Sequence, residues 1–399
     1  MLIGIVGKPN VGKSTFFKAL TLTHAEIANY PFTTIQPNHG IGYVRVPCPE
    51  THFHTKCRPK HGFCKEGIRF VPVELLDVAG LVPGAHEGKG RGNQFLDDLR
   101  AADAFIHVID LSGGTNELGE PVAANSRNPA EDVRFLDHEL DLWYLRLMRK
   151  TWEKFVRTTT QEKGEAAPAI ARQLSGLNVR EDMVVQLLKE LRLEGVRLGD
   201  WQGSDLERFA ERLRQETKRM LIAANKADVP GAADHLARLQ QEFPKLRMRA
   251  CSAECELALR EAAQHGLIAY TPGDGSFAVQ AAERLSVRQA GALSFIEQEV
   301  LGRFGTTGVQ ECLNATVFEL LKCKAVFPVA NPKFTDQDGN VLPDCFLVPP
   351  ATTALQFAFL VHTDLGQRFV RAVDLRRNIA VGKDHVLQDG DVIQIVSAR

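Results

Sequence analysis

The phosphate-loop motif at residues 7–14 constrains the fold of this chain more than any other feature. The segment Gly-Lys-Pro-Asn-Val-Gly-Lys-Ser fits the pattern G-x-x-x-x-G-K-[ST]; an apolar run at 2–6 precedes it and a helical pattern at 13–20 follows it. In this strand–loop–helix context, backbone N–H groups and the positive helix N-terminus bind the phosphates of a nucleotide. The motif predicts nucleotide binding by Lys8, Pro9, Asn10, Val11, Gly12, Lys13, Ser14 and Thr15.

Four further apolar runs follow the motif, at 68–76, 104–110, 219–224 and 246–250. Each is short enough for a buried strand, and helical patterns separate several of them. Strands that alternate with helices favour a parallel sheet. The sequence therefore predicts an α/β domain built around the phosphate loop.

Asp77 and Gly80, which follow the strand pattern at 68–76, predict how a triphosphate is held. Asp77 opens the segment Asp-Val-Ala-Gly, which ends at Gly80. A carboxylate at this strand end can hold the shell of a Mg²⁺ ion that Ser14 also ligates, and the Gly80 N–H can contact a γ-phosphate. An isolated Asp here would be an ordinary turn residue, but its place behind a phosphate loop favours the metal role.

Asn225, Lys226 and Asp228 form an N-K-x-D pattern directly after the strand pattern at 219–224. The Asp228 carboxylate can accept hydrogen bonds from the N1–H and 2-amino group of guanine, whereas adenine offers no such donor pair. Ser252 and Ala253 follow the next strand, where a backbone N–H can meet guanine O6. The three motifs in this order predict a Ras-like GTPase that binds GTP.

Other segments resemble the Obg family of GTPases. Residues 29–38 and 84–96 are similar to its two switch segments, and Gly-Ala-His at 84–86 resembles the YchF subfamily. Residues 338–344 and 362–366 resemble a TGS domain. The resemblance implies a Ras-like P-loop GTPase domain with a helical, coiled-coil-like insertion and a C-terminal, ubiquitin-like α+β TGS domain.

The predicted domain boundaries follow from these patterns. The GTPase domain is split, because a charged segment with helical periodicity interrupts the α/β alternation. Its apolar residues recur at spacings of 4, 3 and 4, as on one face of a helix: Leu136, Leu140, Trp143 and Leu147. That insertion is either a partner-binding unit or a set of solvated helices that pad the fold. The expected parts are 1–126 and 218–262 for the GTPase domain, 127–217 for the helical insertion, 263–322 for a helical connection packed on the GTPase domain, and 323–399 for the TGS-like domain.

The resemblance also assigns roles in hydrolysis. Thr34 (or Thr33) is expected to bind Mg²⁺ and the γ-phosphate. Leu81 stands where many GTPases have a water-orienting Gln, and leucine makes no hydrogen bond to water, so slow turnover is expected. Asn10 is a candidate for accompanying a K⁺ ion near the phosphates, and His86 for positioning water; turn chemistry and plain surface are their alternatives. The catalytic candidates are Lys13, Thr34, Gly80, Asn10 and His86, and the Mg²⁺ ligands are Ser14, Thr34 and Asp77.

The resemblance bears on substrate and partner too. Typical YchF proteins have a degraded base-reading motif and accept ATP, but this chain keeps the full N-K-x-D pattern, which favours GTP. The resemblance implies the ribosome, rRNA or tRNA as partner, contacted through the TGS and helical parts. A nucleotide-gated stress or redox adaptor with incidental hydrolysis is the alternative. A metabolic P-loop kinase is disfavoured by the base-reading motif.

Composition narrows the class of protein. The chain has 399 residues, 48 Lys+Arg and 49 Asp+Glu, and a net charge of −1, which excludes a wholly basic nucleic-acid binder. A basic cluster at 368–383 is either a phosphate-contacting face or a protected strand edge. The sequence contains no run of about 18 apolar residues, so we predict no membrane-spanning helix. With no secretory signal at the N-terminus, we expect a cytoplasmic protein. We also expect a monomer rather than an oligomer.

The eight cysteines are scattered and include no C-x-x-C pair, which favours reduced cytosolic thiols over a disulfide scaffold. The segment 48–64 is nevertheless dense in metal-ligand residue types. Zinc takes Cys and His at short spacings, although the spacing here is not that of a zinc knuckle. Cys57 and Cys64 are therefore candidate zinc ligands, and an ordinary loop is the alternative.

Overall fold

The computed structural model describes residues 1–22, 38–78, 80, 100–162, 164–336 and 338–398. A seven-stranded sheet forms the centre, in the order β2-β4-β1-β5-β6-β7 with β3 paired to β4. The pairs β1–β4, β1–β5, β5–β6 and β6–β7 are parallel, whereas β2 and β3 run antiparallel to β4. The strands are β1 (Leu2–Val6), β2 (His39–Pro47), β3 (Phe63–Lys65), β4 (Ile68–Asp77), β5 (Ala104–Asp110), β6 (Met220–Asn225) and β7 (Arg247–Ala250).

The predicted α/β architecture is confirmed, and every strand predicted for it is present. All seven residues of β5 are buried, as are all six of β6. Central parallel strands have helices on both faces, so both sets of alternating side chains must be apolar. The helices against this sheet include α1 (Lys13–Thr21), α7 (Ala232–Glu242), α8 (Ala253–Gln264) and α11 (Val309–Ala315).

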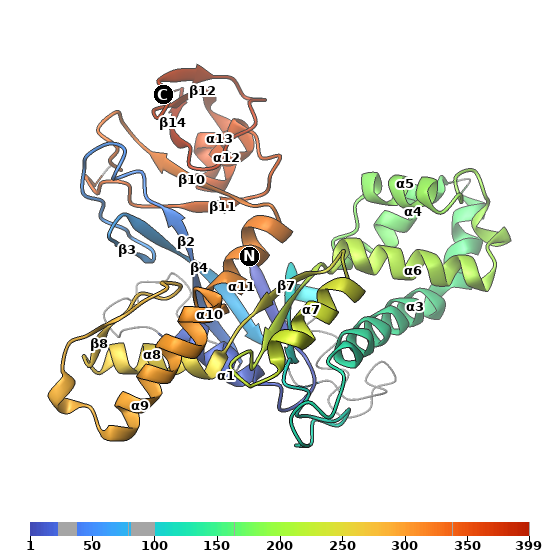
Figure 1. Cartoon of the computed structure of the whole chain (residues 1–399). Helices are drawn as coiled ribbons and strands as arrows, with labels where there is room; N and C mark the ends of the chain where they lie inside the picture. The colour runs from blue at the N-terminus through green and yellow to red at the C-terminus, as the bar shows by residue number, and fades with distance from the viewer. Residues whose placement is uncertain (23–37, 79, 81–99, 163, 337, 399) are drawn as a thin grey trace.

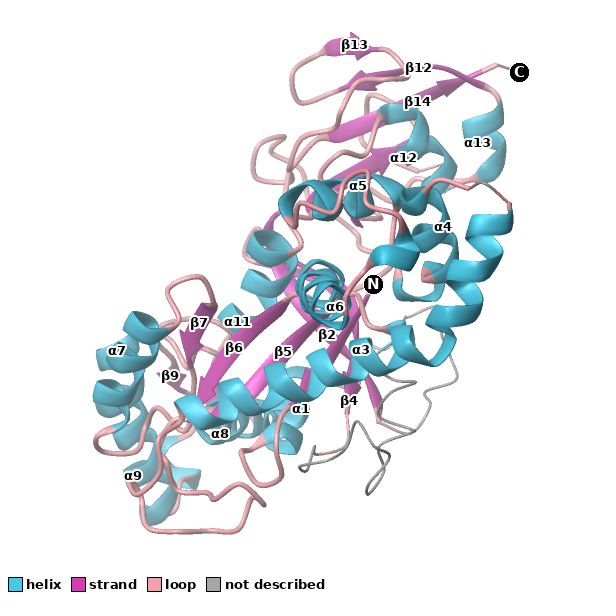
Figure 2. Cartoon of the chain, turned by 90° about the vertical axis from the view of Figure 1, so that its right-hand side faces the viewer, coloured by secondary structure: helices cyan, strands magenta, loops and turns pink. Residues whose placement is uncertain are grey.

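Alternate residues of β5 supply two different cores. Ile106 and Val108 join the cluster that contains Phe16 of α1 and Leu313 of α11. Phe105 points into the opposite cluster with the inserted helices. Helices lie on both faces of the central sheet (Figure 2), and the phosphate loop follows its strand β1.

The helical insertion projects from one side of the sheet (Figure 1). Three of the four residues in the predicted apolar stripe of its first helix are buried: Leu136, Leu140 and Trp143 each retain 2% exposure or less, and Leu147 is half-buried. This stripe packs with Phe209 and Leu213 of the returning helix, in a cluster that continues into the sheet through Phe105 and Met220. The elements are α3 (Ala130–Gln161), α4 (Ala166–Gln173), η3 (Ser175–Leu177), α5 (Glu181–Glu190), η4 (Leu198–Asp200) and α6 (Gly203–Thr217).

A mostly helical connection follows the last strand of the sheet. It packs on α8 through a small apolar cluster that includes Leu259, Ile268 and Val300. Its elements are β8 (Ile268–Ala269), β9 (Ala278–Val279), η5 (Ala282–Arg284), α9 (Val287–Phe295), the π-helix η6 (Ile296–Leu301), α10 (Gly302–Phe304), α11 and the π-helix η7 (Thr316–Leu320).

The C-terminal domain has a second sheet, in the order β11-β10-β14-β12-β13, with β10 parallel to β14. Phe357 of the helix over this sheet is fully buried. The strands and helices are β10 (Lys324–Val329), β11 (Phe346–Val348), α12 (Ala354–Val361), α13 (Thr363–Gln367), β12 (Phe369–Asp374), β13 (Ile379–Val381) and β14 (Val392–Ser397). Phe327 and Val392 also belong to the main apolar cluster of the first domain, so a continuous core joins the two.

Within the described ranges, none of the helices combines the length and the apolar character that a membrane crossing requires.

Candidate nucleotide-binding site

The phosphate loop connects β1 to α1 and depends on glycine at two positions. Gly7 and Gly12 have φ angles of 148° and 96°. A Cβ atom on Gly7 would lie 2.4 Å from the Val108 carbonyl oxygen, and one on Gly12 would lie 2.3 Å from Asn225 Nδ2. Only glycine fits such close approaches, so the loop can present its backbone N–H groups to phosphate.

Lys13 lies inside this loop. Its Nζ donates a hydrogen bond of 2.7 Å to the carbonyl oxygen of Lys8. Burial lowers the pKa of Lys13 to about 8, although the charge of Asp77 opposes that shift. A Cβ atom on Gly80 would lie 3.2 Å from this Nζ, so Gly80 borders the position where a terminal phosphate would meet Lys13.

Ser14 and Asp77 form a pair of oxygen donors beside Lys13. The Ser14 hydroxyl donates to Asp77 Oδ2 over 3.1 Å. Burial raises the pKa of Asp77, and the Ser14 hydrogen bond and the Lys13 charge act against that rise. Hard oxygen donors of this kind suit Mg²⁺, which keeps several waters and takes one or two protein ligands beside phosphate oxygens. The other predicted contributors, Thr33, Thr34, Leu81 and His86, lie outside the described residues.

Asn225 fastens the base-binding side to the phosphate loop. It lies at the end of β6, where its Nδ2 donates to the Val11 carbonyl oxygen over 2.8 Å. Its Oδ1 accepts the Ala253 N–H over 2.9 Å. One side chain therefore joins three segments that are distant in the sequence: the phosphate loop, the end of β6 and the start of α8.

Lys226 has a left-handed backbone, with φ of 65°, and its Nζ pairs with Asp110 Oδ2 over 2.8 Å. Asp110 also accepts hydrogen bonds from the Ser112 and Thr115 hydroxyls. Burial acts to raise the pKa of Asp110, but these bonds and the Lys226 charge bring it below its ordinary value. The carboxylate therefore stays ionised and anchors the lysine. Sequence reasoning missed Asp110, although its place at the carboxyl end of a buried strand was a usable signal.

The motifs surround one cavity of about 460 Å³. A volume of this order suits a ligand of nucleotide size. The residues predicted from three separate parts of the sequence meet here. The lining is Asn10, Gly12, Lys13, Ser14, Thr15, Asn225, Lys226, Asp228, Val229, Ser252, Ala253 and Glu254.

Three models of known protein families match successive parts of the chain. Residues 2–139 match the model of the 50S ribosome-binding GTPase domain, residues 223–331 that of the Obg-like GTPase YGR210-like, G4 motif-containing domain, and residues 333–397 that of the TGS domain. A GTP-binding protein of Methanocaldococcus jannaschii is 47% identical over 398 residues, which cover 100% of this chain and 99% of that protein. The chain belongs to the Obg-like GTPase family.

Two solved structures resemble this Obg-like GTPase. A GTP-binding protein from Pyrococcus horikoshii is 38% identical, covers 100% of both chains and superposes with a TM-score of 0.81. The YchF GTPase of Schizosaccharomyces pombe covers 99% of this chain and 97% of its own, with a TM-score of 0.58; at 20% identity it shares the fold. The Ribosome-binding ATPase YchF of Pasteurella multocida is 42% identical over 139 residues, 35% of this chain and 36% of that protein.

Several residues predicted to bind nucleotide use their side chains elsewhere in this Obg-like GTPase. Asn10 has φ of 60°, and its Nδ2 donates to the Gly119 carbonyl oxygen over 2.9 Å. Lys8 turns its side chain away from the cavity, to the Thr115 carbonyl oxygen and to Asp132. A contact from Lys8 to a phosphate would therefore have to come from its backbone N–H. Sequence reasoning missed Asp132, because its partner lies more than a hundred residues away.

The Ser252–Ala253 segment lies at the cavity, at the start of α8. The Ser252 hydroxyl accepts the Cys255 N–H as the helix N-cap. The Ser252 N–H donates to the Thr307 carbonyl oxygen, and the Ala253 N–H is taken by Asn225. A guanine O6 contact therefore requires an N–H that is shared with Asn225 or one further along the helix N-terminus.

The candidate zinc ligands Cys57 and Cys64 lie apart from this cavity, next to Cys48 and Glu50. The histidines of the same segment are not members of that group, among the residues the structure describes.

Proposed function

We propose that this Obg-like protein is a Mg²⁺-dependent switch that binds and slowly hydrolyses GTP and acts on the ribosome in the cytoplasm, as a monomer. The observation that carries the proposal is the arrangement around Asn225, which bonds the phosphate loop at Val11 and the base-side loop at Ala253. A base-reading carboxylate and a triphosphate loop are thereby held at one cavity. The full-length relatives named as GTP-binding proteins support this reading.

GTP is the preferred nucleotide in this proposal. Asp228 lines the cavity as an acceptor-only group, which pairs with the two donors of guanine and leaves adenine without a match. Competition between GTP and ATP for a fluorescent GDP analogue tests the preference. Tighter binding of ATP than of GTP would contradict it and would favour the ATP-accepting behaviour of typical YchF proteins.

For hydrolysis, Ser14, Asp77 and Thr34 hold Mg²⁺ in the proposed complex, and Lys13 and the Gly80 N–H face the γ-phosphate. Preorganised positive charge of this kind stabilises the charge of the transition state. Leu81 supplies no hydrogen bond to water, which makes intrinsic turnover slow, and His86 is the candidate for positioning water. A K⁺ ion near Asn10 would add charge at the phosphates. Equal hydrolysis rates in KCl and NaCl would exclude a K⁺ requirement.

The ribosome is proposed as partner because the matched relatives and domain model carry ribosome-binding names. The basic cluster of the C-terminal domain is partly used within the fold. Arg377 pairs with Asp374 and Asp391, and Arg376 bonds the Gly390 carbonyl oxygen. The remaining basic residues are exposed and suit contacts to phosphate groups: Arg368, Arg371 and Lys383.

Co-sedimentation with ribosomal subunits under a GTP analogue and under GDP tests the partner. Binding that depends on the nucleotide supports the switch. Single-turnover hydrolysis with and without subunits separates the two functions that remain: stimulation supports a translation GTPase, and an unchanged rate supports a stress or redox adaptor with incidental hydrolysis.

A further inference from the structure

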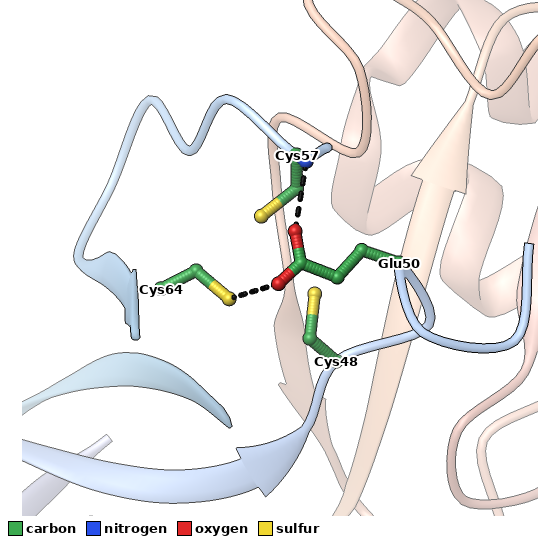
Figure 3. A group of neighbouring side chains, drawn as sticks. All are labelled: Cys48, Glu50, Cys57 and Cys64. Carbon is green, nitrogen blue, oxygen red and sulfur yellow. Dashed lines mark hydrogen bonds between the residues drawn. The ribbon is translucent and has the colours of Figure 1, made fainter. Parts of the chain in front are cut away.

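Three thiols and one carboxylate converge in the segment between β2 and β4. The Sγ atoms of Cys48, Cys57 and Cys64 and an oxygen of Glu50 all lie within 4.8 Å of one another. Figure 3 shows the four side chains directed at a common centre; Cys64 comes from β3, and the other three come from the loop between β2 and β3. Ligands of a tetrahedral zinc ion lie about 3.8 Å apart, given a Zn–S distance of about 2.3 Å, so small side-chain shifts complete the geometry.

Glu50 is held in place for this role. Its Oε2 accepts the Cys57 N–H over 2.9 Å, and its Oε1 accepts the Cys64 thiol over 3.1 Å (Figure 3). The hydrogen bond from the Cys57 N–H orients the Glu50 carboxylate, in the way that neighbouring groups orient the ligands of a bound metal ion. The thiol bond is the contact that a metal ion would replace.

Arg69 supplies a second, independent observation. This residue of β4 is fully buried and is paired in register with Cys64. Its Nη2 donates to the Leu342 carbonyl oxygen, but its Nε and Nη1 have no hydrogen-bond partner among the residues that the structure describes. A buried cation therefore needs negative charge at this cluster.

We propose that Cys48, Cys57, Cys64 and Glu50 bind one structural Zn²⁺ ion. The three thiols lose their protons on binding, and the resulting zinc–thiolate–carboxylate centre carries net negative charge that compensates Arg69. Thiolate ligands in a tetrahedral set select zinc over hard cations such as Mg²⁺. Four protein ligands leave no open position, so the ion is structural and takes no part in the GTPase chemistry.

The zinc-bound segment carries contacts to the C-terminal domain. The N–H groups of Arg58 and Lys60 donate to the carbonyl oxygens of Val341 and Pro343. Phe53 stacks on Phe334 of that domain with ring centroids 3.9 Å apart.

Lys60 also pairs with Asp336 over 2.6 Å. The segment has little regular structure of its own, so the metal would hold in place the surface on which the C-terminal domain sits.

Metal analysis of the full chain tests the proposal. The protein is expressed without a His tag, reduced and freed of loosely bound ions, and its metal content is measured by mass spectrometry. We expect about one zinc per chain. Cys57→Ser and Cys64→Ser should retain only a small fraction of it, while the matched control Cys323→Ser, outside the cluster, should keep it. Protein without zinc, or a control variant that loses zinc equally, would overturn the proposal.

A second measurement uses the wild-type protein, so it remains valid even if the cysteine variants fail to fold. Wild-type protein is stripped with a chelator and loaded with Co²⁺, whose thiolate charge-transfer absorption reports sulfur ligation. We expect this absorption, its loss on adding Zn²⁺, and a lower Tm for the stripped chain. Glu50→Gln should weaken zinc affinity by at least about tenfold, because even residues that only orient metal ligands contribute that much. Absence of the cobalt band, or a Cys–Cys disulfide within the cluster in the isolated protein, would refute the site.

Discussion

Lys8 of the phosphate loop forms an ion pair with Asp132 in the first turn of α3, with 2.7 Å between Nζ and Oδ1. The two side chains are 5% and 10% exposed. The nucleotide site is thereby tied to the first turn of the helical insertion by a buried contact. A movement of the loop backbone at Lys8 should therefore displace the start of α3, because close-packed interiors transmit displacements.

Asp132 makes the stability of this contact depend on pH. Burial raises its pKa from 3.8 to about 6, although the hydrogen bond and charge of Lys8 oppose the rise. From about pH 4 to pH 6 the unfolded chain releases the proton while the folded chain keeps it, so this group makes the fold less stable as pH rises through that window. Asp132→Asn cannot ionise and keeps an oxygen acceptor for Lys8. We expect its stability relative to wild type to increase from pH 4.5 to pH 7.5, by about 2 kcal/mol.

Thermal unfolding of both proteins at the two pH values measures this difference. Asp132→Leu is the matched variant without an acceptor; it should be less stable than Asp132→Asn at both pH values by about 1–3 kcal/mol. An Asp132→Asn protein that loses stability relative to wild type as pH rises would show that the ion pair stabilises the fold.

Gly12→Ala should disable nucleotide binding while the fold remains. The new Cβ would lie 2.3 Å from Asn225 Nδ2, at a φ of +96° that side chains rarely adopt. The clash displaces the bond from Asn225 to Val11, and we expect at least about tenfold weaker GTP binding, or 1.4 kcal/mol. Gly291→Ala, in open space on α9, is the matched control and should bind as wild type does. Equal affinities for the two variants would contradict the close approach.

Asp228→Asn should exchange the base preference. Guanine offers two donors to the carboxylate, whereas xanthine has an oxygen in place of the 2-amino group and pairs with an amide. We expect GTP affinity to fall about 100-fold, since two hydrogen bonds to a charged group are lost, and xanthosine triphosphate to bind more tightly than GTP. Equilibrium binding of both nucleotides measures this. Asp234→Asn makes the same charge change on α7, outside the lining of the cavity, and should leave the preference unaltered.

Lys13 should take up a proton when nucleotide binds. Its pKa of about 8 in the free protein will rise beside a triphosphate, so affinity should fall as pH rises through about 8. At pH 8.5 we expect uptake of about 0.7 proton per GTP, against close to none at pH 7. Calorimetry in two buffers of different ionisation enthalpy measures the number of protons taken up per GTP bound. Binding heats that do not depend on the buffer at pH 8.5 would exclude the shift, and Lys13→Arg, which does not titrate, should show no uptake.

The central fold was predictable because its signals are local. The apolar runs at 104–110 and 219–224 became β5 and β6, since uninterrupted apolar strands require cover on both faces. The insertion was predicted as helical from the spacing of Leu136, Leu140 and Trp143, but α4 and α5 give it a more complete core than a two-helix hairpin has. Helix periodicity shows which face is buried and not what covers it.

The candidate site was predictable in part for the same reason. Asp228 and Lys13 belong to short motifs whose chemistry depends on neighbouring residues. Asp110 was missed, because its role comes from its pair with Lys226, which follows the neighbouring strand β6 and is distant in the sequence. The zinc candidates were named from composition as Cys57 and Cys64, whereas Cys48 and Glu50 join them only through the fold of the segment.

By itself, the sequence determined the phosphate loop and the order of the motifs, because steric limits on the backbone act within a few residues. Gly7 and Gly12 allow the positive φ angles of that loop, which is a local property of the backbone. The tertiary structure alone decided that Lys8 meets Asp132, that Asn225 reaches Val11, and that Arg69 is buried against thiols. Such contacts depend on strand register and helix packing. Many residues of the core set these together, so no single stretch of sequence predicts them.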